Sequence, residues 1–200
     1  VHMAGAYARM TGRVGVCLAS NGPGAANALA GVAVEEGEGN RVLLITSWRR
    51  RGIVDPDRGG TYQYFDQPTV IAAMAKSSEA VTNPDRLGEA MARAFRHCWA
   101  GRPGVVHVTI SEDIVNGPCG AGDERVPARS RRQSPIATDA DTVRRAAQML
   151  IAAESPMIHA GTGVVHSGAS AALARVAALL DAPVTTSWGG RDCIDERLSN

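Results

Sequence analysis

Aromatic residues are scarce in this sequence, and its net charge is close to zero. It contains two Phe, three Tyr and three Trp among 200 residues, and its formal net charge at pH 7 is +1. Two short basic clusters, Arg49-Arg50-Arg51 and Arg129 to Arg132, have no interleaved aromatic residues. Nucleic-acid interfaces need a concentrated basic surface, often with aromatic side chains on which bases stack. We therefore expect no nucleic-acid partner and interpret both clusters as solvated loops.

Long apolar runs and paired metal ligands are also missing. No stretch approaches the roughly 18 consecutive apolar residues that suggest a transmembrane helix, and we find no signal peptide, so we expect no membrane partner. The cysteines form no C-x-x-C pair and have no His at metal-ligand spacing; they are Cys17, Cys98, Cys119 and Cys193. This pattern predicts reduced thiols in a cytoplasmic protein and no metal ligands in this sequence.

The sequence also has no initiator methionine. It opens at Val1 and enters directly into a segment, Met3 to Met10, that is typical of the later part of a helix closed by Gly12. It stops at Asn200, before enough elements have accumulated to complete a second sheet. We expect a fragment of a larger enzyme chain, inactive when isolated.

A regular alternation of apolar strands and helices is present. Three largely apolar runs, Val14 to Leu18, Val42 to Thr46 and Val105 to Ile110, are separated by segments with helical character. One helix is expected from Gly24 to about Val34, and another begins near Asn83 and places its apolar residues on one face. Strands covered on both faces need such apolar runs. The sequence therefore predicts an α/β fold with a doubly wound parallel sheet.

Composition divides the chain into three parts. Residues 1–115 hold the first sheet, and residues 116–138, rich in Gly, Pro, Arg and Ser, are typical of a linker. Residues 139–200 predict the first part of a second, Rossmann-like α/β domain. There we expect helices capped by Asp141 and by Ser170, and two strands that close a βαβ unit.

The glycine-rich turn after the first strand is the main candidate for a ligand site. Gly22-Pro23-Gly24 separates the strand from an Ala-rich helix, and Pro23 suits a first helical turn. In open parallel sheets, ligands bind beyond the carboxyl ends of the strands. The alternative is a plain tight turn, which these residues also favour.

Residues on both sides of this turn show a resemblance to a known family. Gly15 to Asn27 resembles the pyrimidine-binding domain of thiamine diphosphate enzymes of the acetolactate synthase group, as does the preceding helix, His2 to Gly12. Gly60 to Gln67, then Lys76, then Ala100 to Val108 follow in the family's order and near its spacing. The matches run in series over more than half of the chain.

This resemblance implies a cofactor and a set of residues that bind it. The cofactor is thiamine diphosphate, whose diphosphate binds with Mg²⁺ on a domain that we do not find in this sequence. Three positions would line the aminopyrimidine pocket, and two glycines would keep the turn accessible; they are Ser20, Pro23 and Asn27, with Gly22 and Gly24. In the family a glutamate activates the cofactor, and by its spacing that residue would precede Val1.

The resemblance also implies residues near the substrate, a 2-keto acid. Gln63 and Lys76 match positions expected to be catalytic, and Tyr62 matches a position of the substrate pocket. A cation there would stabilise carboxylate or enolate charge. Alternatively, Lys76 is a solvated cation after a short helix. The sequence Ser47-Trp48-Arg49 departs from the family pattern, which leaves the choice of substrate open.

A flavin site is a further possibility. The second domain resembles the family's central domain, which in several members holds FAD in a structural role. Gly161-Thr162-Gly163 is a partial dinucleotide fingerprint without its third glycine. A plain turn between strand and helix explains Gly161 and Gly163 as well as a flavin does.

Two classes of function follow from the sequence. The first is a thiamine diphosphate-dependent transferase or lyase that joins or decarboxylates 2-keto acids. Its leading member is acetolactate synthase, an enzyme of branched-chain amino acid biosynthesis, with oxalyl-CoA decarboxylase and aldehyde lyases as relatives. In this class the active site lies between the subunits of a homodimer or tetramer. The second is a non-catalytic module of the same fold, which fold alone does not exclude.

Overall fold

The computed structural model describes residues 1–54, 56–58, 62–118 and 137–197. The chain divides into two compact units, Val1–Gln133 and Ser134–Asn200, and each is described by itself. Most of the predicted linker, with Cys119 and the cluster Arg129 to Arg132, lies outside the described residues. The predicted boundaries 1–115, 116–138 and 139–200 therefore stay a prediction.

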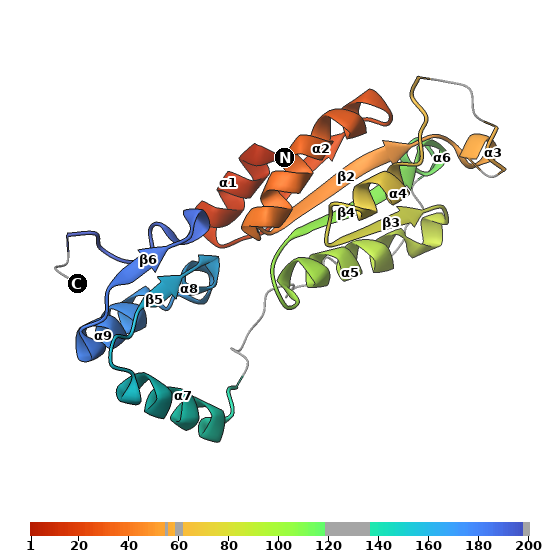
Figure 1. Ribbon diagram of the computed structural model, residues 1–200. Coiled ribbons are helices and arrows are strands. Elements are labelled where there is room, and N and C mark those ends of the chain that lie inside the picture. The colour runs from red at the N-terminus through yellow and green to blue at the C-terminus, as the bar shows by residue number, and fades with distance from the viewer. Residues whose placement is uncertain (55, 59–61, 119–136, 198–200) are drawn as a thin grey trace. The chain divides into compact units, whose positions relative to one another are not determined.

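A four-stranded parallel sheet forms the centre of the first unit (Figure 1). Its strands are β1 (Gly15–Ala19), β2 (Val42–Trp48), β3 (Ser77–Val81) and β4 (Val105–Ser111), arranged in the order β1-β2-β4-β3. Gly15 pairs with Val42, and Val42 with Val105, so the first residues of three strands lie at one edge of the sheet. The three apolar runs predicted as parallel strands are confirmed.

Helices cover both faces of this sheet. They are α1 (His2–Thr11), α2 (Pro23–Glu38) and α4 (Gln67–Ala72) on one face, and α5 (Leu87–Trp99) on the other. Leu44 packs with Val32 and Ile71 of the first group, whereas its neighbour Leu43 packs with Ala94 of α5. Consecutive strand residues point to opposite faces, so each strand contributes to two cores. The doubly wound arrangement is confirmed.

Helix α2 is longer than the sequence predicts. The sequence predicts an end near Val34, before a polar stretch, but the helix continues to Glu38 and closes at Gly39 in the left-handed conformation. The reason is that two of these polar residues have buried partners. Glu35 accepts hydrogen bonds from Asn40 and contacts His2, and Glu36 accepts one from the Val105 N–H at 2.7 Å.

The segment around the cluster Arg49-Arg50-Arg51, interpreted from the sequence as a solvated loop, is partly regular structure. Strand β2 extends to Trp48, and a short helix, α3 (Arg51–Val54), follows it. Residues 55, 59 and 60 lie outside the described residues. Two further short elements of this unit are η1 (Pro84–Arg86) and α6 (Glu112–Val115).

The second unit contains a small parallel βαβ arrangement. Its elements are α7 (Ala140–Ala152), β5 (Ile158–Ala160), α8 (Thr162–Ser167), α9 (Ser170–Leu180), β6 (Val184–Thr186) and η2 (Trp188–Gly190). Strands β5 and β6 pair in parallel, with Ile158 opposite Val184, as predicted. Across the described parts of both units, no helix has the length and apolarity needed to cross a membrane.

Both predicted helix caps of this unit are wrong. Helix α7 is capped by Asp139, whose carboxylate accepts from the Thr142 N–H at 2.7 Å, and Asp141 lies in its first turn. Helix α9 is preceded by Ala169 and has no side-chain cap, so Ser170 is its first residue. Helix α7 therefore begins one residue before the predicted cap Asp141, and α9 begins at the predicted cap Ser170 itself.

Candidate active site

The turn after β1 is held in a conformation that favours glycine. Gly22 has φ 58° and ψ −113°, a region that L side chains rarely adopt. A Cβ at this position would lie 2.4 Å from the Cα of Gln63. The turn therefore needs glycine both for its dihedral angles and for its close approach to the backbone at Gln63.

Gln67 connects this turn to the sheet. Its Oε1 accepts a hydrogen bond from the Gly22 N–H at 2.9 Å. Its Nε2 donates to the Ser47 carbonyl at 3.0 Å and to the Thr46 hydroxyl at 3.1 Å. The Gln67 side chain is fully buried, and Asp66 caps the helix that it begins. The start of α4 and the glycine turn thus form one hydrogen-bonded unit.

Three predicted cofactor-binding residues lie exposed around this turn. Ser20, Pro23 and Asn27 are all solvent-exposed, and Pro23 and Asn27, four residues apart, share one face of α2. A Cβ on Gly24 would lie 2.3 Å from the Ser20 Oγ. These residues therefore lie exposed to solvent at the carboxyl end of β1.

Gln63 lies at the same edge of the sheet. Its Oε1 is 3.5 Å from Nη1 of Arg49, which follows β2 directly, and the same Nη1 donates to Glu112 Oε1 at 3.0 Å. Arg49 and Glu112 are mostly buried. Tyr62, beside Gln63 in the chain, is 83% exposed. The structure therefore brings Gln63 to the glycine turn and leaves Tyr62 in solvent.

Lys76 does not lie with Gln63. It precedes the first residue of β3, and its N–H donates to the carbonyl of Val105, the first residue of β4, at 2.9 Å. Its Nζ donates to carbonyls at the end of α5, those of His97 at 2.6 Å, Ala100 and Arg102 at 2.8 Å. The resemblance groups Lys76 with Gln63 near the substrate, but Lys76 lies at the amino edge of the sheet, opposite to the glycine turn. Spacing along the chain does not specify which edge a residue occupies.

Buried polar residues beneath α4 escaped the sequence analysis as site residues. His107 is fully buried in β4 and contacts the Thr46 hydroxyl at 2.9 Å and the Ser78 hydroxyl at 2.7 Å. Burial lowers the pKa of His107 to about 4, so its imidazole is neutral at pH 7. The available signal was the polar pair His107 and Thr109 on one face of an otherwise apolar strand.

The glycines of the suggested flavin site lie in ordinary surroundings. A Cβ on Gly163 would meet nothing within 4 Å, and a Cβ on Gly161 would make only a normal contact of 3.7 Å with Ser187. Neither residue has a positive φ. Neither glycine is therefore required by a close approach of backbone to another group.

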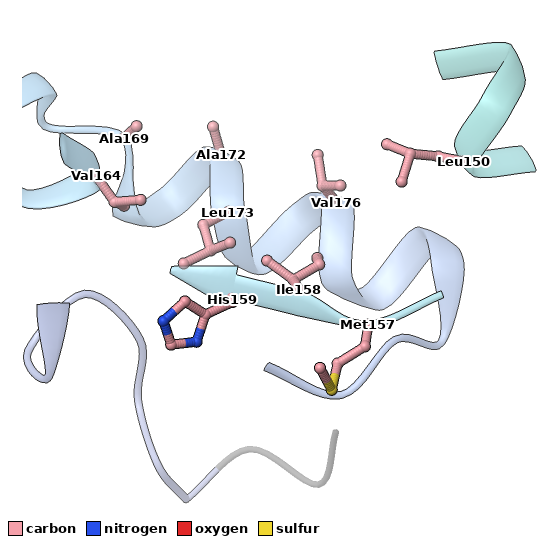
Figure 2. Close-up of a pocket in the computed structure, with 9 residues that line it drawn as sticks. All are labelled: Leu150, Met157, Ile158, His159, Val164, Ala169, Ala172, Leu173 and Val176. Carbon is pink, nitrogen blue, oxygen red and sulfur yellow. The ribbon is translucent and has the colours of Figure 1, made fainter. Parts of the chain in front are cut away.

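An apolar hollow is present in the second unit (Figure 2). It encloses about 480 Å³ and is lined by Leu150, Met157, Ile158, His159, Val164, Ala169, Ala172, Leu173 and Val176. Its one ionisable residue, His159, already has a partner in the Thr185 hydroxyl at 2.9 Å. In the described parts of the chain, no group of three or more His, Cys, Asp or Glu side chains is placed to hold a metal ion.

Two known sequence families match the chain in order. Residues 1–70 match a family described as "Thiamine pyrophosphate enzyme, N-terminal TPP binding domain", and residues 143–200 match "Thiamine pyrophosphate enzyme, central domain". The first match contains the glycine turn, Gln63 and Gln67. The second covers most of the second unit.

Curated relatives match almost the whole chain. A probable acetolactate synthase large subunit of Methanocaldococcus jannaschii is 29% identical over 98% of this chain and 33% of its own length. The acetolactate synthase large subunit IlvB1 of Mycobacterium tuberculosis is 32% identical over 95% of the chain and 30% of its own length. A probable 2-ketoarginine decarboxylase of Pseudomonas aeruginosa is 31% identical over 94% of the chain and 33% of its own length. The chain thus spans about a third of the length of these relatives.

Proposed function

Because this chain belongs to the thiamine pyrophosphate enzymes, we propose that its first unit provides the aminopyrimidine-binding wall of a thiamine diphosphate site. The observation that carries the proposal is the turn at Gly22, which only glycine fits and which Gln67 holds at the carboxyl edge of the sheet. Ligand sites of open parallel sheets lie at this edge.

The residues around the turn have distinct roles in this proposal. Pro23 provides an apolar surface for the ring, and the polar side chains of Ser20 and Asn27 orient its nitrogen atoms by hydrogen bonds. Gly22 and Gly24 allow the turn to pack closely against Gln63 and Ser20, which positions these neighbouring side chains. When bound, thiamine diphosphate supplies the nucleophilic carbon that adds to the keto group of a substrate. Gln63, next to the turn, offers an amide that can position that substrate.

The remaining parts of the cofactor need other residues. We propose that the diphosphate and Mg²⁺ bind to another domain of the assembled protein, across a contact between identical subunits. The resemblance to the acetolactate synthase group implies this division of the cofactor. The surroundings of Gly161 and Gly163 do not call for glycine, so these residues do not support FAD, and we include no flavin in the proposal.

The proposed reaction is carboligation of 2-keto acids, as in the acetolactate synthases that the chain resembles. A second candidate, decarboxylation or a lyase reaction, is favoured by the match to a probable 2-ketoarginine decarboxylase. We place acetolactate formation from pyruvate in a cytoplasmic enzyme first, because several of the relatives that match nearly the whole chain are acetolactate synthases.

Cofactor binding and product analysis test this proposal. In the protein that carries this chain, we expect Ser20→Ala and Asn27→Ala each to weaken thiamine diphosphate binding about tenfold, measured by calorimetry. Asn116→Ala, which removes the side chain of another exposed Asn, is the matched control and should bind normally.

Incubation with pyruvate, Mg²⁺ and thiamine diphosphate should then yield acetolactate. An aldehyde product in place of acetolactate would instead support a decarboxylase or lyase reaction. Tight cofactor binding without turnover of any 2-keto acid would instead support the non-catalytic module.

A further inference from the structure

A line of polar side chains crosses the buried face of the sheet below α4. Ser78, His107, Thr46 and Thr109 lie on three neighbouring strands, on the face that also carries Leu44. His107, Thr46 and Thr109 are each at most 1% exposed. Polar groups are buried in an apolar core only when hydrogen bonds compensate for the loss of water. The direction of each bond in this line can therefore be assigned.

The assignment begins at the glycine turn. The Gly22 N–H can only donate, so the Gln67 oxygen faces it and the Gln67 Nε2 must face Thr46 and Ser47. An amide nitrogen has no lone pair to offer, so the Thr46 hydroxyl accepts from it. The opposite orientation of the carboxamide would place two donors, Gln67 Nε2 and the Gly22 N–H, against each other.

The remaining bonds follow from the single proton of each hydroxyl. We assign the Thr109 proton to the Thr46 carbonyl at 3.3 Å, and the Thr46 hydroxyl then donates to Thr109 Oγ1 at 2.8 Å. With its proton used there, Thr46 accepts from His107, which in this assignment carries its proton on Nε2; a Thr109 hydroxyl that donated to Thr46 Oγ1 would instead leave the His107 proton on Nδ1. A neutral imidazole then has a lone pair on Nδ1, which accepts from the Ser78 hydroxyl at 2.7 Å.

We propose that Gln67 is a positioning residue for the cofactor turn, and that His107, protonated on Nε2, fixes the orientation of the Gln67 carboxamide through the Thr46 hydroxyl. This inference rests on the proposed function only for its link to the cofactor. The hydrogen bonds among these side chains are present in this chain whatever it binds. They hold the Gln67 oxygen against the Gly22 N–H, and this bond in turn fixes the turn formed by Gly22 and Gly24.

Amide hydrogen exchange tests the positioning without any cofactor. In Gln67→Leu and in His107→Leu, we expect the Gly22 amide to exchange about tenfold faster relative to core amides such as Leu44. Normalising to the core separates a local effect from general loss of stability. His107→Gln keeps an amide donor for Thr46 and should restore most of the protection. His159→Leu, which removes a histidine from the second unit, is the control and should leave Gly22 unchanged.

A measurement on the unaltered chain covers the case in which a core variant fails to fold. The nitrogen chemical shifts of His107 should report a neutral ring with its proton on Nε2 at pH 7. A proton on Nδ1, or a Gly22 amide unchanged in Gln67→Leu, would overturn the proposal. If Gln67→Leu speeds exchange of the Gly22 amide and His107→Leu does not, the proposal that His107 orients the Gln67 carboxamide would be overturned.

The cofactor measurement separates this inference from the proposed function. In the protein that carries this chain, Gln67→Leu and His107→Leu should each raise the Kd of thiamine diphosphate together with the exchange rate of Gly22, and His107→Gln should keep both closer to normal than His107→Leu does. If the exchange rate responds and the Kd does not, the positioning stands and the proposed cofactor site fails. If the exchange rate does not respond, the positioning fails whatever the Kd shows.

Discussion

At the scale of single residues, Gly22 has the least freedom to change. Its positive φ and the 2.4 Å approach of a Cβ to Gln63 mean that Gly22→Ala must displace the turn or the loop that carries Gln63. We expect a loss of about 2 kcal/mol or more in the free energy of unfolding, and weaker thiamine diphosphate binding in the assembled protein. Chemical denaturation and calorimetry measure the two effects.

Gly37→Ala is the matched control for that change. Gly37 lies within α2, the helix that Gly22 precedes, and a Cβ there would meet nothing within 4 Å. Because alanine has the higher helix propensity, this variant should be as stable as the original chain or slightly more stable. An equal loss in both variants would show that the turn at Gly22 has no special requirement for glycine.

Lys76 gives a second prediction at this scale, and here the structure replaces the expectation from sequence. Its ammonium group binds carbonyls at the end of α5, where a cation is favourable. We therefore expect Lys76→Ala to lower the free energy of unfolding by about 1 to 2 kcal/mol and to change kcat/KM less than threefold. A loss of 100-fold or more in kcat/KM with normal stability would restore the catalytic role.

His107 predicts how stability depends on pH. Burial lowers its folded pKa to about 4, below the ordinary value of 6.5, so the unfolded chain binds a proton more readily. The contribution of the neutral His107 side chain to the free energy of unfolding is complete above pH 6.5. It is lost as the pH falls toward 4, and the total loss is roughly 3 kcal/mol. His107→Gln has no such proton to bind. Urea unfolding at several pH values should show a flatter dependence between pH 6.5 and 4 for this variant.

At the scale of elements, sequence predicted the strands and most helices but not all of their ends. Apolar runs such as Val42 to Thr46 were sufficient, because a strand buried on both faces tolerates little else. The end of α2 was missed because the partners of Glu35 and Glu36 lie elsewhere in the chain. The hydrogen bonds of Gln67 were missed for the same reason.

The caps of the second unit provide a prediction for this scale. The Asp139 carboxylate accepts from the Thr142 N–H, and hydrogen bonds with the side chain and then the backbone of Thr142 lower the pKa of Asp139. We expect Asp139→Ala to lower the Tm of the second unit by a few degrees. Asp141→Ala, the position expected from sequence, is the natural comparison. A larger loss for Asp141→Ala would show that the cap lies where the sequence analysis placed it.

At the scale of the whole molecule, the order of elements was predictable and the location of the site was only partly so. The sequence placed the turn at Gly22 beyond the carboxyl end of its strand, and the structure brings Gln63 to that turn. The resemblance grouped Lys76 with Gln63 near the substrate, although Lys76 precedes a strand and therefore lies at the opposite edge. Neighbours across a sheet depend on strand order, which the local pattern does not contain.

The 200-residue chain by itself should bind thiamine diphosphate weakly. The proposed wall contacts only the aminopyrimidine ring, while the charged diphosphate and Mg²⁺ are assigned to another domain. We expect no binding at micromolar concentrations in calorimetry with Mg²⁺ present. Micromolar affinity would mean that this chain holds the diphosphate too, contrary to the proposed division of the cofactor between domains.

The most direct test of the central claim is a crystal structure of the assembled protein with thiamine diphosphate and Mg²⁺. The account predicts that the aminopyrimidine ring lies against Pro23, within hydrogen-bond distance of Ser20 or Asn27, above a turn still held by the bond from the Gly22 N–H to Gln67. A cofactor whose ring lies elsewhere, with this wall open to solvent, would contradict it.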